Sequence, residues 1–172
     1  MAFKGPWGTF VHIPKCGGVA MRQHLILKFK VDGEDIGPPH GIPDDLTGAW
    51  TIVRHPANWL LSYYTYLFEN RWRWADLPEQ IAGWLSFADG LWWPQYVEAV
   101  CTEQPGVVGK IFDLYCKPGM QVFQLEKIGL IFDEPIPVIH ETVNKPLMTD
   151  AHWDMICAAE AETLRKYEYN NR

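Results

Sequence analysis

The sequence predicts an α/β fold with a small parallel sheet covered by helices on both faces. Two short apolar runs rich in aromatic and β-branched residues, 7–13 and 49–53, are typical of buried strands. Each run is followed by a turn and then by apolar residues at helical spacing. Two successive β–turn–α units favour parallel strands, because a parallel pair needs a long crossover connection.

The remaining elements are predicted in chain order. Helical spacing covers 19–29, and residues 31–45, with three glycines and three prolines, form a loop. After Pro56 we expect a helix over 57–69. Residues 70–106 read as one or two irregular helices rich in tryptophan, and 107–125 as one or two strands, of which 120–125 is the better candidate. Thr149 or Asp150 is expected to cap a final helix, whose buried face comprises Trp153, Ile156, Cys157, Leu164 and Tyr167.

Length and composition predict a single domain over residues 1–172. Hydrophobic residues make up 48% and charged residues 21%, as in globular proteins. The net charge of −6 argues against the broad basic surface that nucleic-acid binding requires. No apolar run is long enough to span a membrane, and residues 1–10 lack the apolar core of a signal peptide. We therefore expect a cytoplasmic protein without nucleic-acid or membrane partners; the oligomeric state is not predicted.

The four cysteines are widely spaced and form no C-x-x-C pair. This spacing argues against a zinc site and favours free thiols, with a Cys101–Cys116 bridge as the alternative. No metal site is predicted.

Residues 12–18, with the sequence HIPKCGG, lie between the first predicted strand and the first helix. Gly17 and Gly18 allow a tight turn that directs backbone N–H groups toward one point, and the helix N-terminus attracts an anion. Lys15 adds a full positive charge. An ordinary strand–helix turn is the alternative. Lys15 precedes both glycines, unlike the lysine of a P-loop, which disfavours an ordinary ATP- or GTP-dependent kinase.

Arg54 and Ser62 form a second constellation, at the end of the second strand and in the helix that follows. A guanidinium at the strand end and a hydroxyl about 9 Å along the helix can bind one anion. Alternatively, Arg54 pairs with a carboxylate and Ser62 only fills a helix face. Two anion sites on adjacent β–α units suit a nucleotide with phosphates at both ends of its ribose.

These motifs resemble those of the carbohydrate-type sulfotransferases that use 3′-phosphoadenosine 5′-phosphosulfate (PAPS). FVHIPKCGGVAM is similar to their 5′-phosphosulfate loop, and TIVRHPANWLLSYY to their 3′-phosphate motif. Weaker similarity is seen in PPHGIPDDL, WWPQYVEAV, QVFQLEKI and HETVNKP. The resemblance implies a P-loop-like three-layer α/β/α fold and a cofactor site formed by Pro14, Lys15, Cys16, Gly17, Gly18, Val19, Ala20, Arg54, Ser62 and Asn144.

The resemblance also implies residue roles in transfer of a sulfuryl group to a hydroxyl, such as one on a carbohydrate. Lys15 would stabilise the oxygen that leaves with adenosine 3′,5′-bisphosphate, without a metal. His40 is the expected general base, because its pKa suits proton removal near neutrality. Glu34 and Asp35, in the same loop, are competing candidates. His12 is expected to be a core residue, and His55 either a helix cap or a ligand. His140, like Asn144, is implied near the nucleotide.

Acceptor binding is assigned to Glu34, Trp92 and Trp93. Exposed tryptophans stack on sugar rings, although most of the tryptophans between 72 and 93 are expected to fill the core.

The sequence departs from the family at three positions of the first motif. Cys16, Val19 and Ala20 replace hydroxyl-bearing residues, so up to three hydrogen bonds to the phosphosulfate are lost. Trp59 stands where the family often has a second arginine. These departures leave open a non-catalytic nucleotide- or glycan-binding relative, and an atypical small-molecule kinase is a further alternative.

Overall fold

A computed structural model describes residues 2–30, 32–36, 42–70, 79–132, 136 and 144–170. Its contacts divide the chain into two compact units. The sheet unit comprises Met1–Arg54 and Phe112–Glu141, and the helical unit comprises His55–Ile111 and Thr142–Arg172.

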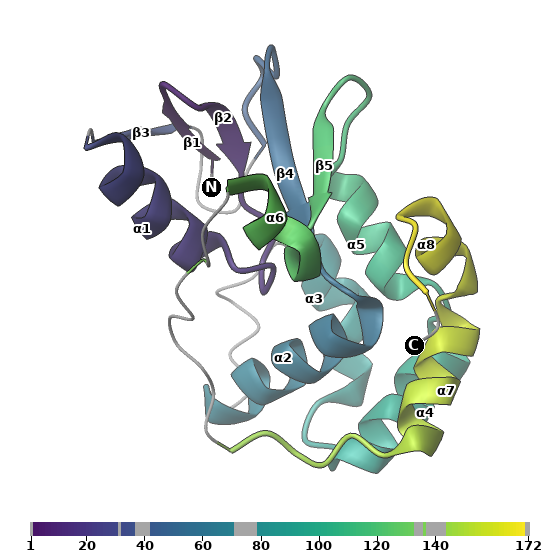
Figure 1. Cartoon of the computed structure of the whole chain (residues 1–172). Coiled ribbons are helices and arrows are strands. Elements are labelled where there is room, and N and C mark those ends of the chain that lie inside the picture. Colours follow the sequence, from purple (N-terminus) through teal and green to yellow (C-terminus); the bar gives the residue numbers. More distant parts are fainter. Residues whose placement is uncertain are drawn as a thin grey trace. The chain divides into compact units, whose positions relative to one another are not determined.

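The sheet unit contains five strands in the order β3-β1-β2-β4-β5 (Figure 1). Their bounds are β1 Ala2–Gly5, β2 Gly8–Val11, β3 Glu34–Ile36, β4 Ala49–Val53 and β5 Gln121–Gln124. β2, β4 and β5 run parallel, as predicted, whereas β1 pairs antiparallel with both β2 and β3. The α/β class is therefore confirmed, but the sheet is mixed. β1 was not predicted, and β3 lies within the segment predicted as loop.

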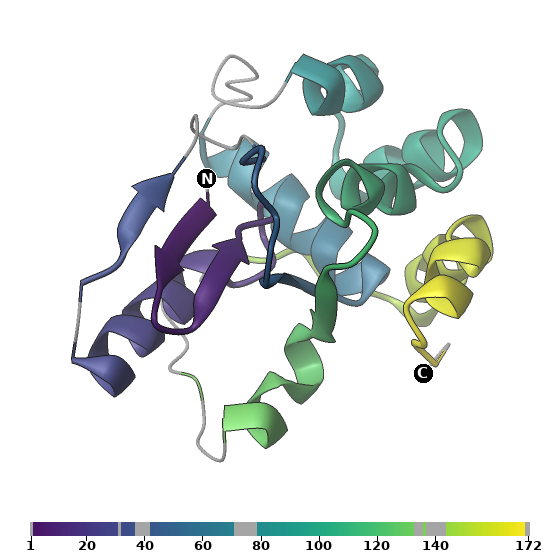
Figure 2. The ribbon, with the colours of Figure 1, turned by 90° about the horizontal axis from the view of Figure 1, so that it is seen from above.

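One face of the sheet packs against α1 (Gly18–Phe29) and α6 (Ile128–Phe132). Figure 2, seen from above, shows both helices on the same side of the sheet. The cluster of buried residues that joins them comprises Phe3, Phe10, Met21, Leu25, Trp50, Ile52 and Ile128. This apolar contact fixes the start of α1 relative to the strands, which matters because the predicted anion loop immediately precedes α1.

β4 is buried along its whole length, in agreement with the uninterrupted apolar run that predicted it. The hydroxyl of Thr51 is accommodated there because its Oγ1 donates a hydrogen bond to the carbonyl of Val11 at 2.6 Å. The bond ties the middle of β4 to the last residue of β2, so the loop that follows β2 starts from a fixed position.

The helices of the helical unit follow the prediction in part. Their bounds are α2 Pro56–Glu69, α3 Glu79–Leu85, η2 Ser86–Ala88, α4 Trp93–Glu103, α7 Asp150–Ala159 and α8 Ala161–Lys166, with α5 Val107–Tyr115 ending in the sheet unit. α2 is confirmed, and so is the cap of α7, where Thr149 Oγ1 accepts from the His152 N–H at 3.2 Å. The predicted final helix breaks at Glu160 into α7 and α8.

Of the one or two strands expected over 107–125, one forms, β5, at the favoured position, whereas residues 107–115 form the helix α5. Glu160 caps this helix from a distance in the sequence: its Oε1 accepts from Val108 N at 2.9 Å and its Oε2 from Gly109 N at 3.2 Å. Thr163 Oγ1 donates to the same Oε2 at 2.6 Å. The buried carboxylate thus satisfies N–H groups that the helix cannot satisfy itself.

All four cysteines are free thiols, so the alternative Cys101–Cys116 bridge is not formed. Among the described residues, no helix combines the length and the apolar character needed to cross a membrane.

Candidate functional site

Three segments leave the sheet at the same edge, because β2, β4 and β5 are parallel. Residues 12–17 follow β2, Arg54 follows β4, and η3 (Leu125–Lys127) follows β5. Strand registers pair Val11 with Thr51 and Val53 with Gln124, so these segments begin at a similar level.

The strand connections reverse direction at this edge. From β2 the chain leads through α1 to β3 on one side of the sheet, and from β4 it leads to β5 on the other. Ligands of open α/β sheets bind beyond the carboxyl ends of the strands at such a switch point. We call residues 12–18, Arg54 and η3 the switch-point site.

The loop before α1 has the conformation expected of an anion-binding turn. Gly17, the N-cap of α1, has a φ of 75°, and Lys15 a φ of 64°, both in the left-handed region. No acidic side chain lies in the first turn of α1, and Gly17 has none with which to cap it. The positive end of the helix is therefore not neutralised by its own side chains.

Both glycines are required by the packing around them. A Cβ on Gly17 would lie 2.9 Å from Leu125 Cδ1, and a Cβ on Gly18 would overlap the imidazole of His12. The loop is thus held between η3 on one side and the His12 ring on another. His12, which the sequence analysis assigned to the core, is only half-buried and packs against the first residue of α1.

Arg54 is joined directly to this loop. Its guanidinium Nη1 donates a hydrogen bond to the carbonyl oxygen of Lys15 at 3.3 Å, and its side chain is half-buried. A guanidinium has five N–H donors, so this bond does not exhaust its capacity to bind a ligand. The structure therefore brings together two of the predicted cofactor residues, Lys15 and Arg54, with the glycine turn between β2 and α1.

Cys16 is directed into the protein rather than toward a ligand. Its side chain is 1% exposed, and its backbone N–H donates to the carbonyl of Ile13 at 3.2 Å. Burial raises the pKa of the Cys16 thiol well above its ordinary value, although the Arg54 charge and a hydrogen bond from the Arg54 backbone lower it. Cys16 is thus a neutral thiol near pH 7, and its replacement of a hydroxyl residue does not place a reactive group in the site.

The other residues predicted in the first motif differ in accessibility. Pro14 is buried, Ala20 is half-buried and Val19 is exposed. Val19 and Ala20 therefore offer apolar side chains at the start of α1, and only their backbone could contact an anion.

Ser62 and Asn144 belong to the helical unit. Ser62 is buried in α2 with 9% of its surface exposed, and Asn144 is exposed ahead of α7. His40, the expected general base, and His140 lie outside the described residues.

The two candidate acceptor tryptophans have opposite environments. Trp92 is 79% exposed, whereas Trp93 is 4% exposed and packs against Tyr64 and Tyr96. Trp93 is therefore a core residue of the helical unit, which corrects its assignment to acceptor binding. Trp92 has an accessible ring, as stacking on a sugar requires.

Glu34 and Asp35 are not brought to the switch-point site. In β3, Glu34 is in register with Lys4 of β1, and Lys4 pairs with Thr9 near the start of β2. Glu34 therefore lies toward the end of the sheet where β2 begins, away from the end where the switch-point site lies. Asp35 forms an ion pair with Arg22, with Oδ2 and Nη2 separated by 3.0 Å. Both carboxylates are exposed, but two strand spacings separate β3 from β2.

His55 is a helix cap, the first of the two roles considered for it. Its Nδ1 accepts from the Ala57 N–H at 3.3 Å, so its Nε2 carries the proton and donates to the carbonyl of Asn170 at 3.3 Å. The ring stacks on Trp153 with a centroid separation of 4.5 Å. These contacts all lie within the helical unit and account for the burial of this histidine.

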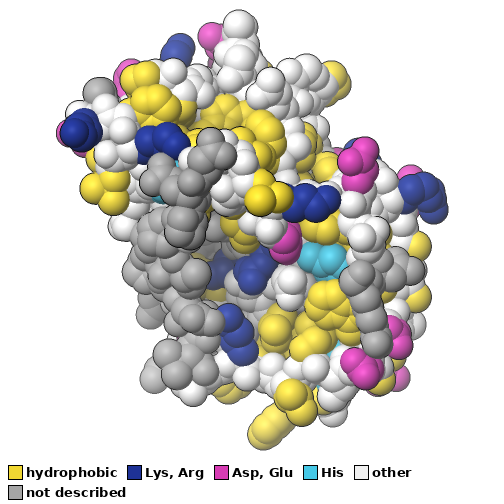
Figure 3. Space-filling view, viewed as in Figure 1, with side chains coloured by type: hydrophobic (Ala, Val, Ile, Leu, Met, Phe, Trp, Pro, Cys, Tyr) yellow, Lys and Arg dark blue, Asp and Glu magenta, His cyan; other side chains and the backbone are white. Residues whose placement is uncertain are grey.

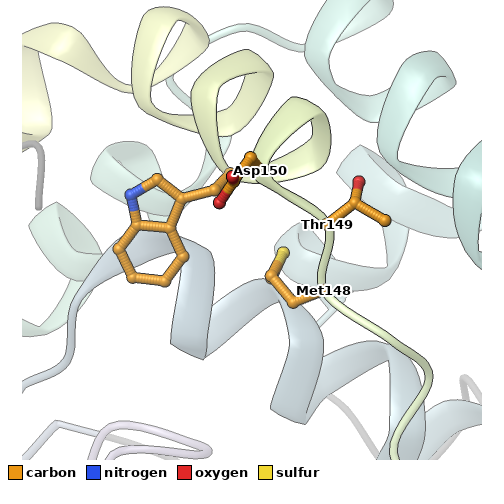
Figure 4. A pocket seen from close by; sticks show the side chains of 4 residues that line it. Met148, Thr149 and Asp150 are labelled. Carbon is orange, nitrogen blue, oxygen red and sulfur yellow. The ribbon is translucent and has the colours of Figure 1, made fainter.

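Sequence reasoning missed a pocket in the helical unit, and it assigned no role to a carboxylate at the switch-point site, although that carboxylate lies in the QVFQLEKI segment noted above. The pocket, of about 350 Å³, is lined by Met148, Thr149, Asp150 and Trp153 at the start of α7 (Figure 4). The carboxylate is Glu126, in η3 directly after Leu125. The pairing of β5 with β4 places it there; the sequence predicts a strand at 120–125 but not which strand lies beside it.

Charged side chains are dispersed over the face shown in Figure 3. On the face shown in Figure 3, lysine and arginine side chains form small separate groups among acidic and apolar ones. A ligand anion would thus be bound by local groups rather than by a broad basic surface.

No protein-family model, curated protein or solved structure matches the chain.

Proposed function

We propose that the protein is a sulfotransferase that moves a sulfuryl group from PAPS to an acceptor hydroxyl, on a carbohydrate in the first instance. The observation that supports it most is the junction of two motifs: the Lys15–Gly18 loop and Arg54 leave adjacent parallel strands at one edge and are joined by the 3.3 Å hydrogen bond. The proposal includes the P-loop-like three-layer α/β/α arrangement and residence in the cytoplasm, with which four free thiols are compatible.

Each group at the switch-point site has a role in this proposal. The turn at Gly17 and Gly18 and the N-terminus of α1 bind the 5′-phosphosulfate through backbone N–H groups. Lys15 stabilises the negative charge that develops on the oxygen between phosphorus and sulfur as the bond from sulfur to this oxygen breaks. Arg54 binds the 3′-phosphate, where a guanidinium gives a charge-assisted bond of about 1.5–3 kcal/mol. The resemblance further assigns Ser62 and Asn144 to the nucleotide and Trp92 to the acceptor; all three residues belong to the helical unit.

A non-catalytic nucleotide-binding relative is the second candidate, and one observation favours it. Val19 and Ala20 provide no hydroxyl at the start of α1, where they would face the sulfuryl group. This candidate predicts binding of adenosine 3′,5′-bisphosphate without sulfate transfer to any acceptor.

Thermal denaturation with and without adenosine 3′,5′-bisphosphate tests the proposal. At a ligand concentration about 100 times the Kd, binding adds about 2.7 kcal/mol to the free energy of unfolding, which raises the Tm of a chain of this size by roughly 5–10 °C. ATP with Mg²⁺ should give a smaller rise, whereas a larger rise with ATP would favour the kinase alternative.

Variants at Arg54 locate the binding site. Arg54→Ala should remove most of the ligand-induced rise, because it removes a charge-assisted bond and the brace on the Lys15 carbonyl. Arg54→Lys, which keeps the charge without the forked donors, should retain part of it. The matched control is Arg165→Ala, at an exposed arginine of α8 in the helical unit. A full rise in Arg54→Ala would exclude Arg54 from the nucleotide site.

A further inference from the structure

Glu126 lies at the switch-point site because of the strand that precedes it. β5 pairs with β4 so that the last residues of the two strands, Val53 and Gln124, lie opposite each other. Arg54 is the first residue after β4, and Leu125 is the first residue after β5. Leu125 contacts the glycine turn, since a Cβ on Gly17 would lie 2.9 Å from its Cδ1. Glu126 follows directly in η3, and its side chain is exposed. A carboxylate therefore borders the same loop that carries Lys15.

The charge of Glu126 acts on this loop. The Cys16 thiol, between Lys15 and Gly17, has its pKa raised by burial first, and the negative charge of Glu126 is among the further contributors. This interaction is consistent with a position of Glu126 near the residue between Lys15 and Gly17.

The other carboxylates considered for proton removal are placed differently. Glu34 and Asp35 both lie in β3, two strand spacings from β2. Glu126 is accessible to a ligand, follows the parallel strand next to β4, and adjoins a residue in contact with the anion loop. It therefore borders the loop proposed to hold the phosphosulfate, which is where a general base for the acceptor hydroxyl is required.

We propose that Glu126 is the general base of the switch-point site and takes the proton of the acceptor hydroxyl. This inference rests on the proposed sulfotransferase function. As the acceptor oxygen forms its bond to sulfur, the bond from sulfur to the bridging oxygen breaks. The electron pair of that bond stays on adenosine 3′,5′-bisphosphate, beside Lys15. The acceptor proton passes to the Glu126 carboxylate and from there to water.

The test compares Glu126→Gln, Glu126→His and the control Glu103→Gln, which changes an exposed carboxylate of α4. Calorimetry measures the binding of adenosine 3′,5′-bisphosphate. Radiolabelled PAPS measures sulfate transfer to galactose- and N-acetylglucosamine-containing oligosaccharides and sulfate release to water. Glu126→Gln should lower the transfer rate about 100-fold or more, the usual contribution of a general base. It should also bind the bisphosphate about threefold more tightly at low salt, because a like charge is removed, and this gain should shrink at high salt.

The pH profile separates a base from a structural residue. In Glu126→His the acid limb of kcat/KM should move away from its wild-type position toward about pH 6.5, where a free imidazole titrates. If Glu126→Gln changes neither the rate of sulfate transfer nor the affinity for the bisphosphate, the inference is overturned while the sulfotransferase proposal stays intact. Loss of transfer with an unmoved pH limb in Glu126→His would also overturn it. A wild type that neither binds the bisphosphate nor releases sulfate would instead refute the proposed function.

Discussion

Arg54 donates a hydrogen bond to the carbonyl oxygen of Lys15, and these two residues come from neighbouring parallel strands, 39 positions apart in the chain. The bond joins the end of β4 to the loop after β2, so one side chain carries a positive charge and supports the backbone of the other motif. The conformation of the loop and the position of Arg54 are therefore coupled, and a change in one should affect ligand binding by both.

Lys15→Ala should separate leaving-group stabilisation from nucleotide binding. If Lys15 acts mainly on the oxygen that gains charge as the bond breaks, kcat for sulfate transfer should fall much more than affinity for adenosine 3′,5′-bisphosphate. Single-turnover transfer and calorimetric binding measure the two quantities. Equal losses in both would show that Lys15 contributes only to ground-state binding. Exposed Lys110 of α5 provides the control substitution, Lys110→Ala.

Alanine at the two loop glycines should impair both stability and binding. Gly17→Ala introduces a left-handed residue with a side chain, at about 1–2 kcal/mol, and a contact with Leu125. Gly18→Ala pushes against the His12 ring, for which about 1–3 kcal/mol is typical of overpacking. Bisphosphate affinity should fall about tenfold or more if the turn is displaced. Urea denaturation and calorimetry measure the two effects.

The matched control is Gly83→Ala in α3, where nothing lies within 4 Å of the added Cβ. This change should stabilise the protein by roughly 0.5–1 kcal/mol through helix propensity, without an effect on the ligand. Gly17→Ala and Gly18→Ala variants as stable as the wild type would contradict the packing described here.

The buried Glu160 carboxylate should make stability depend on pH in a particular direction. Burial is the main cause that raises its pKa above 4.5, and it outweighs the lowering effect of the hydrogen bonds from Thr163, Val108 and Gly109. The folded state thus holds this proton more tightly than the unfolded state. The contribution of Glu160 to stability is full below about pH 4.5 and declines as the pH rises through the raised pKa.

Variants of Glu160 measure this contribution by urea denaturation between pH 4 and pH 8. Glu160→Ala should destabilise the protein by roughly 2–4 kcal/mol, because the N–H groups of Val108 and Gly109 and the Thr163 hydroxyl lose their acceptor. Glu160→Gln should keep part of the cap and remove the decline with rising pH. Asp45→Asn is the contrasting control, since a hydrogen bond from the Thr47 backbone lowers the pKa of Asp45, so its effect has the opposite sign. An unchanged pH dependence in Glu160→Gln would contradict this assignment.

Local sequence was enough to predict an element when the residues of that element alone show its pattern. β4 was predictable from its unbroken apolar run, and α2 from Pro56 and its helical spacing. Val107 and Val108 favour a strand, and the helix over 107–115 was not predicted. The carboxylate that caps this helix comes from Glu160, 52 residues beyond Val108. Likewise, β3 has few apolar residues and is defined by its pairing with β1.

The candidate site likewise combines residues that local sequence predicts with residues that only distant contacts bring into place. Lys15, Gly17 and Gly18 could be predicted because strand, turn and helix are consecutive, and Arg54 because its strand is also buried. The contact between Leu125 and Gly17, and with it the place of Glu126, depends on β5 lying beside β4 after a connection of about 70 residues. No local pattern shows that β5 lies beside β4. The position of η3 next to the glycine turn therefore became known only from the fold.

The closure of the glycine turn by Leu125 and His12 has an evolutionary consequence. Homologues of this chain should vary little at 17 and 18 alone, because any larger residue there meets an occupied volume. A lineage that acquired a side chain at 18 would need a smaller residue at 12, and one that acquired a side chain at 17 would need a smaller residue at 125. Where homologues differ at 17 or 18, we therefore expect a second substitution at the paired position, 125 for 17 and 12 for 18.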